Sequence, residues 1–455
     1  MSMKAIVVKD KLLSGPDEMQ VFTVPIPVPK KGEILVKIEA IGIQGKYQHK
    51  PPLPFIPGRE LSGMVACVHN SSKKFKVGER VFGSIPWGTY TEYVCVKEEQ
   101  IHRAPDNLTY EQAAGFYVAY STSYNKFNMS MKAIVVKDKL LSGPDEMQVF
   151  TVPIPVPKKG EILVKIEAIG IQGKYQHKPP LPFIPGRELS GMVACVHNSS
   201  KKFKVGERVF GSIPWGTYTE YVCVKEEQIH RAPDNLTYEQ AAGFYVAYST
   251  SYVGLVVRGN LKPGETVLVL AAAGGVGIAA VQIAKALGAT VIAAVGSEDK
   301  FDICKREGAD HAINYRNKSW TQEVLKLTNG KGADIIYDPV GMVEESLKCI
   351  AWNGRALVIG FAGGTIEKVA TNRVLLKNVS VVGLRMGSYA INKSELLPQV
   401  SERLFDMIAK GVIKPVVYDP VYYGLENANK ALNAIFNRKS YGKVIIKPSL
   451  SSPKL

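Results

Sequence analysis

An internal repeat limits what this chain of 455 residues can fold into more than any other feature does. Residues 1–124 recur letter for letter as residues 129–252, so that MSMKAIVVKDK begins at Met1 and again at Met129. Solenoid repeats are much shorter and diverge in sequence, so a perfect copy of this length indicates a copying event and not a structural requirement. The first copy stops at NKFN, whereas the second continues into new sequence. We therefore predict residues 129–455 to be the functional unit.

Each copy has the pattern of a β-rich domain. In the second copy, β-branched and apolar residues predict strands at residues 131–136, 161–171, 190–196, 207–211 and 218–224. Clusters of proline and glycine, such as VPIPVPKKGE and KPPLPFIPG, separate these strands.

From Glu265 onwards, apolar strands alternate with helical patterns. Strands are predicted at residues 266–270, 290–295, 311–315, 334–340, 355–361 and 380–386. Helices are predicted between them at residues 278–289, 297–308, 319–330 and 343–352. Strands this apolar are typical of a parallel sheet that helices cover on both faces, so we predict an α/β doubly wound domain.

The turn after the first of these strands, AAAGGVGIAA, carries a dinucleotide-binding pattern. Gly275, Gly277 and Ala280 fit Gly-x-Gly-x-x-Ala between a predicted strand and a predicted helix. Glycines let main-chain N–H groups approach a pyrophosphate at the N-terminus of the helix. We therefore expect the segment Gly274, Gly275, Val276 and Gly277 to bind a coenzyme. The alternative is a close-packed glycine turn without a ligand.

The end of the second strand indicates which coenzyme. NAD enzymes usually carry Asp or Glu there, for the 2′-hydroxyl of the ribose. In this chain Gly296 and Ser297 stand at that place and Lys300 follows, and a hydroxyl with a cation suits a 2′-phosphate. Tyr315 and Arg316, at the end of the third strand, are within reach of the same place. NADPH is therefore predicted over NADH, with a solvated helix lysine as the alternative for Lys300.

Composition excludes several other classes of protein. The formal net charge is +16, but lysines and arginines are scattered, which favours a solvated basic surface over a nucleic-acid site. The apolar run at residues 267–284 has turn residues at its centre, so a strand-turn-helix is predicted and not a membrane span. The N-terminal sequence has no secretory signal pattern, so the cytoplasm is expected, with the mitochondrion as the alternative.

Several motifs together carry a resemblance to a known family: LPFIPGRELSG, FKVGERVFG, TYTEYV, LKPGETVLVLAAAGGVG, GSEDK, INYR, FAGGT and YGKVIIKP. Residues 129–455 resemble the zinc-free quinone oxidoreductase branch of the medium-chain dehydrogenase/reductases over nearly their whole length. The resemblance implies a GroES-like β-barrel catalytic domain at residues 129–252, a Rossmann NADP-binding domain at 253–390, and a return of the chain to the barrel at 391–455. It leaves residues 1–128 as an orphan GroES-like segment. It also implies a homodimer that pairs through the last Rossmann strand, near SVVGLRM.

The resemblance also bears on metal chemistry. Alcohol-dehydrogenase relatives hold catalytic zinc with a cysteine and with the histidine of a Gly-His-Glu motif. The matching motif here is Gly186-Arg187-Glu188, and arginine does not ligate zinc. No four-cysteine structural cluster is present either, so no metal site is predicted. Without a metal, the implied chemistry is direct hydride transfer from the nicotinamide to an electron-poor acceptor.

The same resemblance places Thr250, Val340, Phe361 and Gly363 around the nicotinamide. Their position at the C-terminal ends of strands favours the site for Val340 and Phe361, whereas the alternative makes them ordinary core residues.

One loop departs from the family pattern. In relatives, the strand that matches IEAIGI is followed by a loop with an Asn and an Asp, but here Ile171 runs directly into Gln172. Tyr175 is then the nearest polar candidate on the substrate side, so Tyr175 and Thr250 are the candidate catalytic residues. The alternative for Tyr175 is a loop tyrosine packed on the prolines.

The leading hypothesis is an NADPH-dependent, zinc-independent reductase of quinones or related electron-poor carbonyls. A reductase of enone double bonds is the rival, and a non-catalytic NADPH-binding protein is the alternative that the missing loop suggests. Both copies have the sequence to accept the returning strands. We expect the second copy to receive them, because closing the longer loop to the first copy costs more entropy.

Overall fold

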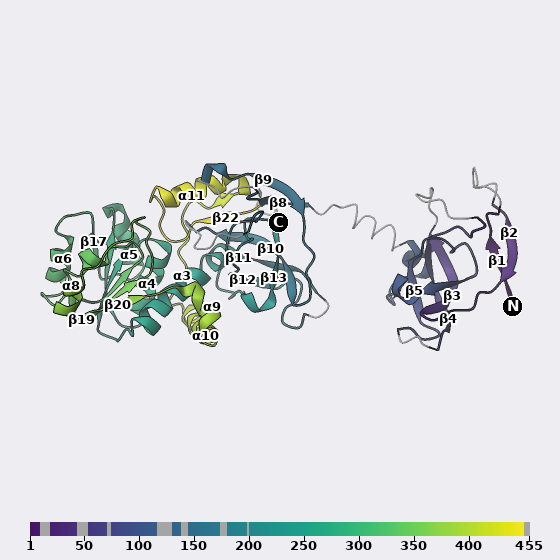
Figure 1. The fold of residues 1–455 in the computed structure, drawn as a ribbon, viewed down its shortest axis with the longest axis horizontal. Helices are drawn as coiled ribbons and strands as arrows, with labels where there is room; N and C mark the ends of the chain where they lie inside the picture. The colour runs from purple at the N-terminus through teal and green to yellow at the C-terminus, as the bar shows by residue number, and fades with distance from the viewer. Residues whose placement is uncertain are drawn as a thin grey trace. The chain divides into compact units, whose positions relative to one another are not determined.

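A computed structural model describes residues 1–9, 19–42, 53–70, 74–115, 130–137, 144–172, 180–197 and 200–449 (Figure 1). The chain divides into two compact units, Met1–Met129 and Ser130–Leu455. The division falls at the boundary between the two copies of the repeat, so each copy folds within its own unit.

The first unit is an antiparallel barrel-like sheet with a separate hairpin. The five-stranded sheet has the order β6-β3-β4-β5-β7, and β1 pairs with β2. The strands are β1 (Ser2–Ile6), β2 (Val21–Pro25), β3 (Glu33–Gly42), β4 (Glu60–Val68), β5 (Arg80–Ser84), β6 (Tyr93–Lys97) and β7 (Ile101–Arg103), with the short helix η2 (Glu98–Gln100) before β7.

The second copy repeats these strands in the same register. Ile162 pairs with Val196 as Ile34 pairs with Val68 in the first copy. Its elements are β8 (Ser130–Ile134), η3 (Pro144–Glu146), β9 (Val149–Pro153), β10 (Glu161–Gly170), β11 (Glu188–Val196), β12 (Arg208–Ser212), β13 (Tyr221–Lys225), η4 (Glu226–Gln228) and β14 (Ile229–Arg231). The five strands predicted from the sequence are confirmed, whereas β9 and β14 were not predicted.

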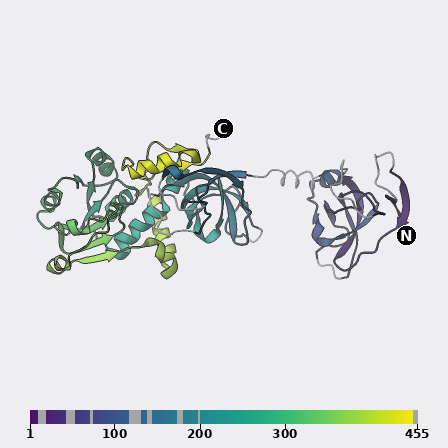
Figure 2. The same ribbon diagram turned by 45° about the horizontal axis from the view of Figure 1, so that its top comes forward.

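A segment from the end of the chain completes the sheet of the second copy. We call residues 420–449 the closing segment; it contains β21 (Tyr422–Tyr423), η8 (Leu425–Asn427), α11 (Ala428–Phe436) and β22 (Ile445–Lys447). Strand β22 pairs with β10 through Ile169↔Ile446 and Gly170↔Ile445, which makes the sheet seven-stranded. Figures 1 and 2 show α11 alongside this barrel. The prediction that the second copy receives the returning strand is therefore confirmed.

The closing segment also supplies part of the barrel core. Buried side chains of α11 and β22 share one apolar cluster with Ile166 and Ile169 of β10. The segment's buried members are Leu425, Ala428, Ala431, Leu432, Val444 and Ile446. Burial of such side chains is the main source of stability in a domain of this size.

The rest of the second unit is built on a six-stranded parallel sheet. Its order is β17-β16-β15-β18-β19-β20. The chain adds β16 and β17 on one side of β15 and then β18, β19 and β20 on the other side, so the switch point lies between β15 and β18, which are parallel. The strands are β15 (Thr266–Leu270), β16 (Thr290–Val295), β17 (His311–Asn314), β18 (Ala333–Asp338), β19 (Ile350–Val358) and β20 (Ser380–Gly383). This is the doubly wound order of a dinucleotide-binding domain, and the α/β prediction is confirmed.

Alternate residues of the central strands point to opposite faces of the sheet. Val267 and Val269 of β15 pack with α3, α4 and α10, whereas Leu268 and Leu270 pack with α6 and α7. The helices are α2 (Tyr238–Ala242), α3 (Tyr245–Tyr252), the π-helical η5 (Val253–Arg258), α4 (Gly275–Ala286), η6 (Glu298–Lys300), α5 (Phe301–Arg306), α6 (Trp320–Leu327), α7 (Val343–Ser346), α8 (Thr371–Leu376), η7 (Met386–Ser388), α9 (Tyr389–Asn392) and α10 (Leu396–Ala409).

The helix predicted at residues 343–352 is wrong in its second half. Helix α7 ends at Ser346, and β19 begins at Ile350, which pairs with Ala333 of β18. The segment is apolar enough for either state, and Ile350 and Ala351 are both 1% exposed because they are buried in the sheet. Burial in the sheet therefore favours a strand over a helix from Ile350 onwards.

Within the described ranges no helix has both the length and the apolar character to cross a membrane. The apolar run at residues 267–284 is strand β15, a turn and helix α4, as predicted.

Candidate active site

The turn between β15 and α4 presents main-chain amides at the switch point of the sheet. Gly274 is the extended residue that precedes the helix, and α4 begins at Gly275. The N–H groups of the first turn of a helix have no acceptor within the helix, so those of Gly275, Val276 and Gly277 point outward from its positive end. No side chain caps this helix. The turn therefore offers an anion a set of donors at the place where doubly wound sheets bind nucleotides.

Two of the glycines are required by their surroundings. A methyl group at Gly277 would lie 2.3 Å from the carbonyl oxygen of Ala271 and 2.7 Å from that of Ala272. At Gly275 it would lie 2.8 Å from Cδ of Lys443. The turn is therefore close-packed on one side, and among the described residues no side chain caps the amides at the start of α4. That one-sided packing is what a pyrophosphate site needs, so the residues fit the predicted coenzyme.

The tip of β16 carries no carboxylate. Gly296 and Ser297 follow the strand directly, and a methyl group at Gly296 would lie 3.0 Å from Oη of Tyr315 and 3.4 Å from Nε of Arg316. The structure thus brings together the tip of the second strand and the two residues that follow the third. A phenol and a guanidinium converge beside Gly296, and Ser297 is the next residue in the chain, which is chemistry suited to a phosphate.

Lys300 is held by the closing segment. Its ammonium donates to the carbonyl oxygens of Arg438 at 2.7 Å and Ser440 at 3.0 Å. Burial lowers the pKa of Lys300, and the nearby Arg316 lowers it further. The alternative of a fully solvated lysine is therefore excluded, and the lysine links the coenzyme-binding half to residues near the C-terminal strand. That link was not predicted.

The ends of β18 and β19 gather three predicted residues. The N–H of Gly363 donates to the carbonyl of Val340 at 2.9 Å, and a methyl group at Gly341 would lie 3.1 Å from the ring of Phe361. Phe361 is 39% exposed, so it is not an ordinary core residue.

A buried carboxylate organises this same edge of the sheet. Asp338, the last residue of β18, accepts the N–H groups of Val340 at 2.7 Å and Gly341 at 2.9 Å, as well as that of Met342. Burial raises the pKa of Asp338 although these three donors oppose the shift. The carboxylate fixes the loop that carries Val340, a role that was not predicted from the sequence.

Helix α3 is fixed to the glycine turn by a hydroxyl. Ser251 donates to the carbonyl of Val276 at 2.8 Å and lies 2.9 Å from the hydroxyl of Tyr337 in β18. Thr250 precedes it in α3 and is 9% exposed. Its neighbour Ser251, and not Thr250 itself, makes the contacts to the turn and to the end of β18. Tyr175, the other catalytic candidate, lies outside the described residues.

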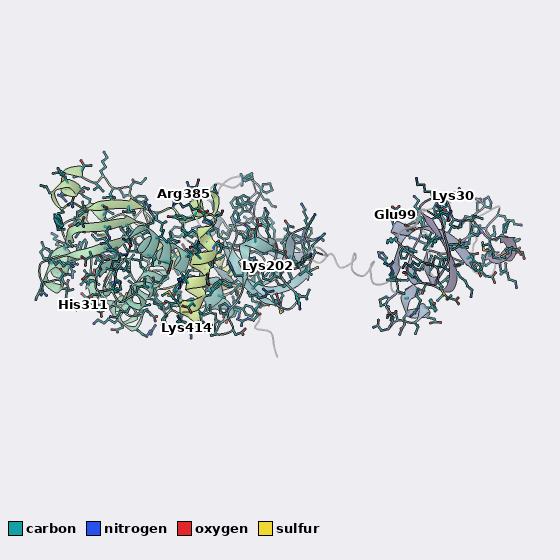
Figure 3. The ribbon with its side chains drawn as sticks, turned by 90° about the horizontal axis from the view of Figure 1, so that it is seen from below. Lys30, Glu99, Lys202, His311, Arg385 and Lys414 are labelled. Carbon is teal, nitrogen blue, oxygen red and sulfur yellow. The ribbon has the colours of Figure 1, made fainter. Side chains whose placement is uncertain are left out.

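The pair that joins the barrel to the coenzyme turn was missed. Nζ of Lys443 lies 2.6 Å from Oε2 of Glu188, and the two side chains are 9% and 1% exposed. Glu188 also accepts the side-chain amide of Gln172 at 2.9 Å and the N–H of Val246 at 2.8 Å. One buried carboxylate thus connects β11, the chain at Gln172, α3 and the closing segment. The chain that leads to the closing segment passes Lys414, which Figure 3 shows between Lys202 of the barrel and His311 of the parallel sheet.

Comparisons with known proteins fit this architecture. The model of the alcohol dehydrogenase GroES-like domain matches residues 30–106 and again 158–234, and that of the zinc-binding dehydrogenases matches residues 275–405. The chain is 31% identical to the human protein named quinone oxidoreductase over 329 residues, which is 70% of this chain and 97% of the relative. This chain belongs to the quinone oxidoreductase family of the medium-chain dehydrogenase/reductases.

Other members of the family are similar over the same region. Quinone oxidoreductase-like protein 2 homolog of Nematostella vectensis is 39% identical over 278 residues, which is 60% of this chain and 76% of that protein. Quinone oxidoreductase of Escherichia coli, solved in complex with NADPH, superposes with a TM-score of 0.63 at 31% identity and covers 70% of this chain and 100% of its own. The GroES-like and Rossmann folds that the resemblance implied are therefore confirmed, and the GroES-like model matches both copies.

The description "zinc-binding" belongs to the family model, and the residues of this quinone oxidoreductase-like chain do not fit it. Arg187 stands where the motif would place a histidine ligand, and a guanidinium offers no lone pair to a metal. No group of three or more His, Cys, Asp or Glu side chains in the described ranges could hold a metal ion.

Proposed function

We propose that the second unit is an NADPH-dependent, zinc-independent oxidoreductase that reduces a quinone or a related electron-poor carbonyl. The observation that carries the proposal is the bare amide turn at Gly274–Gly277, placed at the switch point of the sheet. Three solved relatives support it, since the Escherichia coli, Thermus thermophilus and mycobacterial structures are described as complexes with NADPH.

Each part of the site has a physical task in this proposal. The amides of Gly275, Val276 and Gly277 bind the pyrophosphate, and the helix dipole favours its charge. When bound, NADPH supplies the hydride. The chain supplies position, because a reacting pair held in the correct geometry avoids most of the entropy cost of meeting in solution.

The two ends of the coenzyme are held by different residues in the proposal. Ser297, Tyr315 and Arg316 bind the 2′-phosphate through a charge-assisted contact that NADH does not offer. Thr250, Val340, Phe361 and Gly363 surround the nicotinamide, and the barrel covers the reacting carbon from water. Reduction of the acceptor would need a proton besides the hydride, and Tyr175, the nearest polar candidate on the substrate side, lies outside the described residues.

Calorimetry followed by initial rates tests the proposal on the full chain. NADPH is expected to bind more tightly than NADH, and a water-soluble quinone is expected to be reduced faster than an α,β-unsaturated ketone. Faster turnover of the ketone would favour the enone reductase. NADPH binding without oxidation by either acceptor would favour the non-catalytic alternative. No affinity for either coenzyme would end the proposal altogether.

Replacing Ser297 with aspartate is expected to reverse the preference for NADPH. A carboxylate beside the 2′-phosphate repels it by several kcal/mol at the dielectric of a protein surface, whereas the NADH ribose accepts a carboxylate as a hydrogen-bond partner. The Kd of NADPH should rise by at least about tenfold, while that of NADH should not rise. Ser394→Asp, at an exposed position outside the site, is the matched control. Equal losses for the two coenzymes would place the 2′-phosphate elsewhere.

We also propose that the protein is a homodimer through β20. This strand is the edge of the parallel sheet, and Val381 within it is 41% exposed. The preceding helix α8 leaves Leu375 80% exposed and Leu376 76% exposed. An apolar edge strand of this kind is unusual unless another strand covers it. Light scattering on the full chain should give twice the mass of one chain, and the mass of a monomer would contradict the proposal.

A further inference from the structure

Strand β3 of the first unit is a copy of β10, the strand that the closing segment pairs with in the second unit. Strand β3 has the same sequence and bounds as β10 with an offset of 128 residues. In the second unit, β10 pairs on one edge with β22 of the closing segment. In the described part of the first unit, β3 pairs with β4 and β6, and no third strand lies along it. The edge that β22 covers in one copy is therefore not paired with a strand in the described part of the other.

The exposed fractions of equivalent side chains differ between the two copies. Ile169 is fully buried in the second copy, whereas its counterpart Ile41 is 37% exposed. Ile134 and Ala168 are also buried, and their counterparts Ile6 and Ala40 are half-buried. Since the sequences are the same, the difference in exposure reflects elements that pack on the second copy, and at Ile169 the paired element is β22 of the closing segment. The first copy thus presents an apolar patch along one strand edge.

The polar contacts of the closing segment have counterparts on this surface too. Lys132 contacts Glu426 at 2.6 Å, and Lys447 contacts Glu239 at 2.7 Å. The equivalents of Lys132 and Glu239 in the first copy are Lys4 and Glu111, and both are exposed. The patch therefore carries the charges that match a segment with an acidic residue before α11 and a lysine at the end of β22.

We propose that the first copy is a docking site for the closing segment of a second copy of this chain. Each chain has two acceptor barrels and a single closing segment, so one barrel per chain stays open. Within a chain the second copy binds the closing segment, because the connection between them is shorter than the connection to the first copy. The effective concentration of the segment at the second copy is therefore higher. The open barrel of a neighbouring chain is then available whenever that segment is released. Docking adds a strand to a sheet edge, with main-chain hydrogen bonds for affinity and alternate side chains for specificity.

A labelled peptide of residues 420–449 tests whether the acceptor exists. It is expected to bind the full chain at one site, measured by fluorescence anisotropy. Ile41→Lys should weaken binding by at least about tenfold, because its counterpart Ile169 pairs with Ile446 and the substitution would place a charge at that apolar contact. Since Ile41 is exposed, this substitution leaves the fold of the first unit in place.

Val28→Lys is the matched control within the same unit. Its counterpart Val156 stays 80% exposed with the closing segment in place, so position 28 lies outside the surface that the segment covers. Binding should be unchanged in this variant. Absence of peptide binding would overturn the proposal. So would binding that Ile41→Lys does not weaken, because the peptide would then be displacing the segment from the second copy.

The identity of the occupant is tested with a photoreactive benzoylphenylalanine in place of Ile41. Unlabelled chains that carry it are mixed with isotope-labelled chains of natural sequence at high concentration. Crosslinks from position 41 to residues 441–447 of the labelled chain are expected. Crosslinks confined to one chain, or to another segment of the labelled chain, would overturn the proposal. Neither experiment contains a coenzyme, so its outcome is separate from that of the proposed reductase function.

Discussion

Replacing Gly277 with alanine is expected to abolish NADPH binding and to destabilise the second unit. The added methyl group would lie 2.3 Å from the carbonyl oxygen of Ala271, and neither backbone can retreat without opening the turn. Overpacking of this kind costs about 3 kcal/mol when backbone has to move. The Kd for NADPH should rise by at least about a hundredfold, because the amides that we propose to bind the pyrophosphate lose their alignment. Calorimetry and hydrogen exchange of peptides from residues 253–449 measure the two effects.

Gly387→Ala serves as the control for this prediction. Gly387 lies in the same unit, has no neighbouring heavy atom within 4 Å of the added methyl group, and does not have a positive φ. Its substitution should change neither NADPH binding nor exchange by a measurable amount. If Gly277→Ala behaved like the control, the turn would not be the close-packed support of a coenzyme.

Replacing Lys443 with alanine is expected to destabilise the second unit by about 3–5 kcal/mol, because the carboxylate of Glu188 would stay buried without its cation. Two elements depend on that carboxylate through Gln172 and Val246, so the end of β10 near Gln172 and the start of α3 should also exchange faster with deuterium. Hydrogen exchange measured peptide by peptide gives both the loss of global stability and the faster local exchange.

Two further variants show whether burial is the cause. Lys410→Ala removes a lysine that is 65% exposed and paired with Asp406 at 2.7 Å, and its loss should cost less than about 1 kcal/mol. The double variant Lys443→Met with Glu188→Gln removes both buried charges and should regain part of the stability that Lys443→Ala loses. A double variant as unstable as the single one would show that packing, and not the unpaired charge, accounts for the loss.

The coenzyme turn was predictable from the sequence because its cause is local. Gly277 is needed because of carbonyl groups only five or six residues away, and strand, turn and helix follow each other directly along the chain. The six parallel strands were predictable for the same reason, since each is a short apolar run bounded by a helix pattern. Val340, Phe361 and Gly363 came from the family resemblance, and the structure does bring them to one edge of the sheet.

The contacts that span the chain were not predictable in the same way. Glu188 and Lys443 are 255 residues apart, and nothing in the letters around either residue indicates the other. Lys300 was predicted as a cation for a phosphate, but its partners lie about 140 residues later, in backbone carbonyls that carry no sequence signature. Only the fold brings such groups together. The motif YGKVIIKP supported the resemblance, yet its lysine was given no role.

The order of synthesis gives the late position of β22 a consequence for the cell. Strand β22 is the last described element, so both barrels have left the ribosome before residues 445–447 exist. Every growing polypeptide therefore displays two incomplete sheets during the second half of its translation, after β14 has been made, and bare strand edges are the usual starting points for aggregation. A stop codon before residue 444 would make that stage permanent, and chaperone demand should then rise even though the nucleotide-binding sheet is fully encoded.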